Sequence, residues 1–454
     1  MNKIENNLAQ GNVVRQLLLF SIPFVLSSLV QNLYGMADMI VIGQFAGTAS
    51  LAGVNTGTSF VTVITNIAIG FCNGGTVVIG QYMGMNNREK LREAIGTLCS
   101  FIILLALGLT VLSLVLREQI LALFQVPAAS YAEAMIYYIV CAVGFLFIFG
   151  YNLLSAILRG VGDSQKPFIF ICVACAINIV LDVVLIGLFH MGAFGAALAT
   201  VIAQGTSMIL CIVYLKRHDF VFAFTLQSLR IKKDCMQTLL KVGVPTTIQT
   251  TIGTLAFAIL TAISNSMGVE TAAAMAGGQK VTLFAVLPSV ALGNAIAAMC
   301  AQNFGANRQD RALQTMGTGF AIIMSTNLVL FAIIELFPGT LMRMFGSDSG
   351  MIAQGIIYLR LCSLDFLFIP IQGALVGYLI GSGHATLPAA ISICSSLLFR
   401  APAAYIIGIV LQKGITGVAL STPIASFAVG LFCLIYILTG RCKKIAGIVE
   451  RQAQ

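Results

Sequence analysis

Long apolar stretches follow one another along nearly the whole chain, separated by short polar segments. A helix of about 20 apolar residues is about 30 Å long and crosses the hydrocarbon core of a bilayer. The first stretch has no small-residue cleavage site at signal-peptide distance, so it is interpreted as a membrane helix and not a removed signal. The pattern predicts twelve transmembrane helices, over residues 15–40, 52–80, 94–116, 134–157, 167–188, 194–215, 239–264, 272–301, 313–336, 355–379, 387–410 and 416–438.

Composition agrees with this pattern. Of the 454 residues, 58% are hydrophobic and only 9% are charged, and the mean hydropathy is +0.97. Soluble domains have about a quarter of their residues charged, so this chain has too few charges to cover soluble domains. Most of the twelve cysteines lie inside apolar stretches, where cysteine packs as a small hydrophobic residue.

The net charge of +9 follows from the placement of the basic residues. If the N-terminus is cytoplasmic, nineteen of the 25 lysines and arginines fall in cytoplasmic segments, as the positive-inside rule expects. We therefore expect a multi-pass protein of the plasma (inner) membrane with both termini in the cytoplasm. The same distribution accounts for the charge without a nucleic-acid partner.

The two halves of the sequence repeat each other at an offset of 221 or 222 residues. Four motifs of the first half recur in order in the second. They are Leu17-Leu18-x-x-x-Ile22-Pro23 with Leu239-Leu240-x-x-x-Val244-Pro245, Gln81-x-x-Gly84-x-Asn86 with Gln302-x-x-Gly305-x-Asn307, Gly160-x-Gly162-x-x-x-x-Pro167 with Gly381-x-Gly383-x-x-x-x-Pro388, and Gly192-x-x-Gly195-x-Ala197 with Gly414-x-x-Gly417-x-Ala419.

The repeat predicts an all-α membrane protein of two pseudo-symmetric six-helix bundles around a central cleft. The expected organisation is an N-lobe over 1–215, a cytoplasmic linker over 216–238, a C-lobe over 239–440 and a cytoplasmic tail over 441–454. Because six is an even number, both halves enter the membrane in the same direction. Parallel repeats of this kind are typical of secondary transporters.

The repeated motifs resemble those of the multidrug and toxic compound extrusion (MATE) family. The resemblance rests on Pro23, on Gln81-Tyr82-Met83-Gly84, on Arg159-Gly160-Val161-Gly162-Asp163 and on Gly195-Ala196-Ala197, and it covers almost the whole chain. It implies a V-shaped pair of bundles that exports organic cations against entry of protons or sodium. It also implies that Asp38, Asn178, Asp182 and Thr200 form a cation site in the N-lobe.

The residues themselves favour the same site. A charge at the bilayer centre costs about 2.5–3.5 kcal/mol on insertion scales, so intramembrane acids usually serve a function. Asp38 falls in the first predicted helix, while Asn178 and Asp182 lie four residues apart on one face of the fifth. With the hydroxyl of Thr200 they provide oxygen ligands for Na⁺, or two carboxylates that share a proton. The alternative is a structural role in which a carboxylate pairs with a base.

The repeat argues against that structural role. The positions that match Asp38, Asn178 and Asp182 in the second half are Ile259, Phe399 and Ala403. The scaffold is duplicated and the acids are not, although a purely structural pair would be expected in both copies. We therefore assign Asp38, Asn178, Asp182 and Thr200 to cation coupling, with the first three as Na⁺ ligands if sodium is the coupling ion.

The C-lobe offers a different set of polar residues. The resembled family includes a branch with a C-lobe sodium site, but no acid lies between Lys241 and Glu270 to complete one. Asp365 is expected either to pair with Lys280 or an arginine, or to contact substrate. The candidate residues of a substrate cavity are Asn152, Gln279, Lys280, Asp365 and Arg400.

Taken together, the sequence predicts a cation-coupled antiporter that acts as a monomer, exports organic, amphipathic cations and requires no cofactor beyond H⁺ or Na⁺. The alternative is a flippase of lipid-linked precursors, which should have a strongly cationic cavity, unlike the acidic N-lobe. An enzyme is not expected, because the chain has three histidines and lacks the H-E-x-x-H and G-x-S-x-G motifs.

Overall fold

A computed structural model describes residues 6–440 except 124, 125, 127, 219, 223, 224, 226 and 227, and also residue 447. The described residues are helical, with no β-strand among them. The first half contains α1 (Val13–Phe45), α2 (Gly47–Gly84), α3 (Arg88–Val115), α4 (Arg117–Leu123), η1 (Ala128–Ser130), α5 (Tyr131–Val143), α6 (Phe145–Gly160), α7 (Gln165–Asp182), η2 (Val183–Leu188) and α8 (Gly192–Arg217). The second half contains α9 (Lys233–Asn265), α10 (Val269–Gly305), α11 (Gln309–Leu336), α12 (Pro338–Arg343), α13 (Ser349–Ser363), η4 (Leu364–Leu367), α14 (Ile369–Gly381), α15 (Thr386–Cys394), η5 (Ser395–Arg400), α16 (Ala401–Tyr405), η6 (Ile406–Val410) and α17 (Ile415–Leu438). The predicted tail 441–454 lies outside the described residues apart from residue 447.

Within this described part, eleven helical segments are long and apolar enough to cross a membrane, and α5 with α6 forms a twelfth span that is bent by 53°. The twelve predicted spans are thus all found, and two of them are interrupted. The helix expected over 134–157 breaks at Gly144, and the helix expected over 355–379 is interrupted by the 3₁₀ turn η4. The second break has a clear cause, because Pro370 in the first turn of α14 has no N–H to continue the preceding helix.

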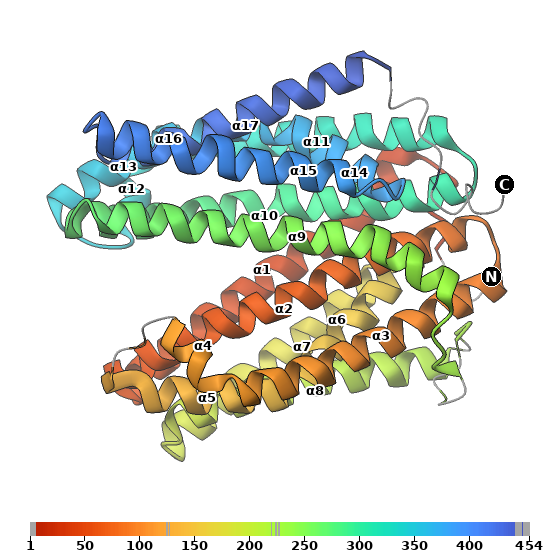
Figure 1. Cartoon of the computed structure of the whole chain (residues 1–454), viewed down its shortest axis with the longest axis horizontal. Helices are drawn as coiled ribbons and strands as arrows, with labels where there is room; N and C mark the ends of the chain where they lie inside the picture. Colours follow the sequence, from red (N-terminus) through yellow and green to blue (C-terminus); the bar gives the residue numbers. More distant parts are fainter. Residues whose placement is uncertain are drawn as a thin grey trace. The chain divides into compact units, whose positions relative to one another are not determined.

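The described chain separates into two compact units. Unit 1 comprises the residues up to Asn7 together with Ile22–Thr247, and unit 2 comprises Leu8–Ser21 together with Ile248 onward. Within each unit the long helices lie side by side (Figure 1). Helices α1 and α9 each contribute to both units, and each passes from one to the other close to its internal proline, Pro23 or Pro245.

Glycines set the closest helix contacts inside each unit. In unit 2, Gly377 of α14 lies against Gly293 of α10, where a Cβ on Gly377 would stand 2.7 Å from the Gly293 carbonyl oxygen. One turn further, Gly381 meets the Ala297 carbonyl in the same way. Small residues at such spacing let helix backbones approach in a bilayer, where packing replaces the hydrophobic effect as the force that joins helices. The contact between α10 and α14 therefore depends on the absence of a side chain at these positions.

This packing generates a stability prediction. Gly377→Leu should destabilise the protein by about 1–3 kcal/mol, because the new side chain forces α14 away from α10. The matched control is Gly317→Leu in α11, where an added Cβ meets no atom within 4 Å. Thermal unfolding of both variants in detergent measures the difference. Equal melting temperatures for the two variants would contradict the assigned contact.

Candidate functional site

The four predicted coupling residues all lie in unit 1, on three helices. Asp38 is on α1, Asn178 and Asp182 are on α7, and Thr200 is on α8. Asn178 and Asp182 are one helical turn apart and so share a face of α7. Asp38 is 7% exposed and Asp182 is fully buried, which places both carboxyl groups inside the unit.

Asp38 and Asp182 come together in space and their charges interact. No lysine or arginine of the described chain forms an ion pair with either of them. Apart from a hydrogen bond that the two carboxyl groups can form with each other when one is protonated, both carboxylate oxygens of Asp182, one of Asp38, and the amide oxygen and nitrogen of Asn178 are buried with no hydrogen-bond partner among the described residues. A buried polar atom without a partner costs free energy, so such a cluster is unfavourable unless something binds it.

A small cavity adjoins these groups. Its volume is about 10 Å³, and its polar lining consists of Tyr34, Asn178, Thr200 and Gln204. That is roughly the space of one water-sized probe, which also suits a single small cation. Tyr34 additionally interacts with the charge of Asp38. The cavity therefore joins Asn178 and Thr200 directly, and Tyr34 links it to the acid pair.

Tyr34 and Gln204 were not among the predicted site residues. Tyr34 precedes Asp38 by four positions, and Gln204 follows Thr200 by four. Residues at that spacing share a helix face, so a search one turn to either side of the predicted residues would have found both. Their polar groups were overlooked because tyrosine and glutamine carry no charge to mark them in an apolar helix.

The backbone of α7 widens immediately after Asp182. Residues Val183–Leu188 form a π-helical turn, in which the Phe189 amide donates to the Val184 carbonyl at 3.0 Å. Such turns occur frequently at functional sites. Here, however, Ile406–Val410 of unit 2 is also π-helical, at the position that the repeat assigns to this turn. The turn is thus a feature of the duplicated scaffold and does not result from the acids of unit 1.

The donor set fits a small cation or a proton. Carboxylate, amide and hydroxyl oxygens are ligands for hard cations, and two adjacent carboxylates can hold one proton between them because both ionise together only at high cost. Among the described residues, no group of three or more histidine, cysteine, aspartate or glutamate side chains could hold a metal ion.

In unit 2, Asp365 lies in η4 and is 8% exposed. Its carboxyl group interacts with the hydroxyl of Ser426 and with the charge of Arg400. The sequence offered Lys280 or an arginine as the partner of Asp365, and the base that interacts with it is Arg400. The guanidinium carbon of Arg400 also stands 5.3 Å from the centre of the Phe257 ring. Unit 2 thus contains a second cluster of interacting side chains, made of the acid Asp365, the base Arg400 and the ring of Phe257.

The other predicted cavity residues are more dispersed. The side-chain amide of Asn152 in α6 donates to the Ile148 carbonyl at 2.8 Å. This hydrogen bond lies within its own helix. In α10, the side-chain nitrogen of Gln279 is buried without a hydrogen-bond partner in the described chain, while Lys280 is exposed. The roles of Asn152, Gln279 and Lys280 stay predictions.

Comparison with known proteins gives a consistent result. The MatE family model matches residues 23–184 and 245–406, which are the two halves of the repeat. Two similar relatives from Bacillus subtilis (strain 168) are the probable multidrug resistance proteins YoeA, 29% identical with 97% of both chains covered, and YpnP, 28% identical with 97% of this chain and 98% of the relative covered.

A solved structure described as the outward-facing conformation of a multidrug resistance MATE family transporter of the MOP superfamily is also similar. It matches with a TM-score of 0.90 at 20% identity, over 96% of this chain and 98% of that one. The similarity confirms the predicted fold class of twelve helices in two bundles.

The uncompensated acid pair generates a prediction about stability. Asp182→Asn should stabilise the protein by roughly 1–3 kcal/mol in sodium-free buffer at alkaline pH, because it removes one of two buried carboxylates that lack a basic partner. Thermal unfolding in detergent measures the change. The control Asp310→Asn removes an exposed carboxylate and should leave the melting temperature unchanged. A lower melting temperature for Asp182→Asn would show that the carboxylate is a structural ligand.

Proposed function

This chain belongs to the multidrug and toxic compound extrusion (MATE) family of efflux transporters, and we propose that it exports organic, amphipathic cations in exchange for entering H⁺ or Na⁺. It is a multi-pass membrane protein. The proposal places it in the plasma (inner) membrane, with both termini in the cytoplasm, where it acts as a monomer.

A single observation carries the coupling proposal. Asp38 and Asp182 are buried together in unit 1 without a basic partner in the described chain, beside the small cavity that Asn178 and Thr200 line. The matching positions of unit 2 carry Ile259, Phe399 and Ala403. The scaffold repeats and the acid pair does not. We therefore assign the pair to cation coupling, a task that one half of the transporter performs.

The proposed coupling follows from the electrostatics of the pair. A cation or proton that enters the site neutralises charge that is otherwise buried and uncompensated, so it stabilises the conformation in which the site is closed around it. Substrate favours the other conformation, and the two ligands thereby compete through the shared equilibrium. One elementary charge that crosses 100 mV releases about 2.3 kcal/mol. At 1.4 kcal/mol for each tenfold change, one coupling ion supports a roughly 40-fold substrate gradient.

The residues for substrate contact stay proposals. Asp365 and Arg400 offer both signs of charge in unit 2, and Arg400 lies over an aromatic ring. With Asn152, Gln279 and Lys280 they are our candidates for the substrate cavity. A carboxylate and aromatic faces are the groups that bind organic cations.

Transport in liposomes tests the coupling pair. Purified protein is reconstituted, an inward-directed pH or sodium gradient is imposed separately, and movement of a fluorescent cationic dye is followed. We expect gradient-driven dye movement in the native protein and a loss of at least about tenfold in Asp38→Asn and in Asp182→Asn, because each variant removes a charge that the coupling ion neutralises. Asp310→Asn should transport normally. Normal transport by both site variants would overturn the assignment.

A second pair of variants distinguishes the two ions. Na⁺ needs the neutral oxygens of Asn178 and Thr200 as ligands, whereas a proton needs only a carboxylate. If sodium drives export, Asn178→Ala and Thr200→Val should each raise the sodium concentration required for half-maximal dye movement by about tenfold. If protons drive it, the same variants should retain the pH-driven rate within about twofold. Loss of both activities with either variant would mean that these residues hold the fold of the site and not the ion.

A further inference from the structure

Unit 1 contains two pockets beside α3 that the coupling site does not use. The first, called the basic pocket, is open, has a volume of about 380 Å³, and is lined by Arg92, Glu93, Ser228, Arg230 and Lys232 together with Phe220, Val221 and Phe222. The second, called the apolar pocket, has a volume of about 250 Å³, and its lining includes Cys99, Ile103, Ala106, Leu153, Met208 and Leu229. Neither pocket is lined by a residue of the proposed coupling site, which consists of Asp38, Asn178, Asp182 and Thr200.

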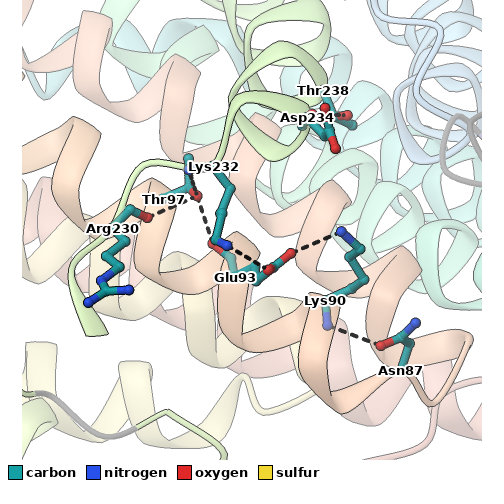
Figure 2. A network of polar contacts seen from close by, with 8 residues as sticks. All are labelled: Asn87, Lys90, Glu93, Thr97, Arg230, Lys232, Asp234 and Thr238. Carbon is teal, nitrogen blue, oxygen red and sulfur yellow. Dashed lines mark hydrogen bonds and ion pairs between the residues drawn. The ribbon is translucent and has the colours of Figure 1, made fainter. Parts of the chain in front are cut away.

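Among the described residues that line the basic pocket, three are basic and one, Glu93, is acidic. Glu93 already accepts from two lysines, Lys90 at 3.0 Å and Lys232 at 3.3 Å. Arg92 uses its Nε to donate to the Val221 carbonyl at 2.7 Å, which leaves its charge uncompensated by that contact. The guanidinium of Arg230 points away from Glu93 (Figure 2). The pocket therefore offers guanidinium groups to an anion, and the contacts that hold the linker do not neutralise them.

The two pockets are neighbours along the same face of α3. Arg92, Cys99, Ile103 and Ala106 recur at helical spacing, so they line one side of the helix from its polar beginning inward. The linker separates the pockets, since Leu229 lines the apolar pocket while its chain neighbours Ser228 and Arg230 line the basic one. Gly96 permits this arrangement, because a Cβ there would collide with the Ser228 carbonyl.

Helix α3 is one of the membrane spans, and the arrangement of the pockets matches the polarity of a lipid. A cationic pocket lies at the beginning of the span, where loop and helix meet, and a hydrocarbon-lined pocket lies further along it. Basic pockets between transmembrane helices on the cytoplasmic side bind anionic headgroups. A soluble anion would leave the apolar pocket unused, and a zwitterionic lipid would leave the excess positive charge uncompensated.

We propose that an acidic phospholipid binds here, with its phosphodiester against Arg92 and Arg230 and an acyl chain in the apolar pocket. The linker backbone is held to α3 between the two parts of the lipid, since the Thr97 hydroxyl accepts from the Lys232 amide at 3.1 Å and the Arg230 carbonyl accepts from Thr97 at 3.4 Å. A bound lipid thus contacts both α3 and the linker, and fastens one to the other.

Native mass spectrometry of the full-length protein tests this. Phosphatidylglycerol and phosphatidylcholine with identical acyl chains are titrated separately, and we expect phosphatidylglycerol to bind more tightly. Arg230→Gln should weaken phosphatidylglycerol binding about fivefold, the usual contribution of one basic residue, and leave phosphatidylcholine unchanged. Arg230→Lys keeps the charge and should retain binding. Ala106→Leu, which fills the apolar pocket, should weaken both lipids by a similar factor.

Two matched controls accompany these variants. Arg117→Gln removes the same charge at the start of α4, and Leu104→Phe enlarges a residue of α3 that is 58% exposed and lines neither pocket. Both should bind lipid as the native protein does. Equal binding of the two lipids, or equal losses in Arg230→Gln and Arg117→Gln, would overturn the proposal. Displacement of phosphatidylglycerol by glycerol phosphate or inorganic phosphate at equal concentration would also overturn it, because the basic pocket would then be an anion site that needs no acyl chain.

Discussion

In the hydrocarbon layer of a membrane, every backbone amide and carbonyl has to find its hydrogen bond inside the protein, because no water is present to supply one. This constraint accounts for a described chain that consists almost wholly of helices and short connections. It also changes how helices associate, since lipid is as apolar as the side chains and only close packing distinguishes protein from lipid. The contacts of Gly377 with Gly293 and of Gly381 with Ala297 are the consequence. Each lets two backbones approach where any larger residue would separate them.

The acid pair of unit 1 departs from this apolar close packing. Asp38 and Asp182 are buried acids, whereas the matching positions of the other half carry the apolar residues Ile259 and Ala403. Natural proteins retain unfavourable groups of this kind where activity needs them. The π-helical turn after Asp182 has a counterpart in unit 2, so the two halves share this backbone feature and differ in the side chains beside it.

The segments that precede α1 and α9 give the scaffold a second shared feature. Arg311 of α11 donates to the carbonyls of Gln10 and Gly11 at 2.7 Å each, while Thr97 of α3 bonds to the backbone of Arg230 and Lys232. The segment before α1 is thus held by α11, and the segment before α9 is held by α3. At α3 this contact lies beside the basic and apolar pockets.

The sequence by itself determined the number and approximate position of the spans, because the length of an apolar stretch is a local signal. Repeated glycines and prolines likewise showed the duplication, and a charge within an apolar segment marked Asp38 and Asp182 as acids inside the spans. The sequence did not determine the breaks at Gly144 and before Pro370, since a glycine or proline in a membrane helix bends it only where the neighbouring helices permit. Tertiary structure alone decided that Asp38 meets Asp182, that Tyr34 and Gln204 complete the cavity, and that Arg400 is the base near Asp365. These are contacts between residues far apart in the chain, and they depend on how helices pack.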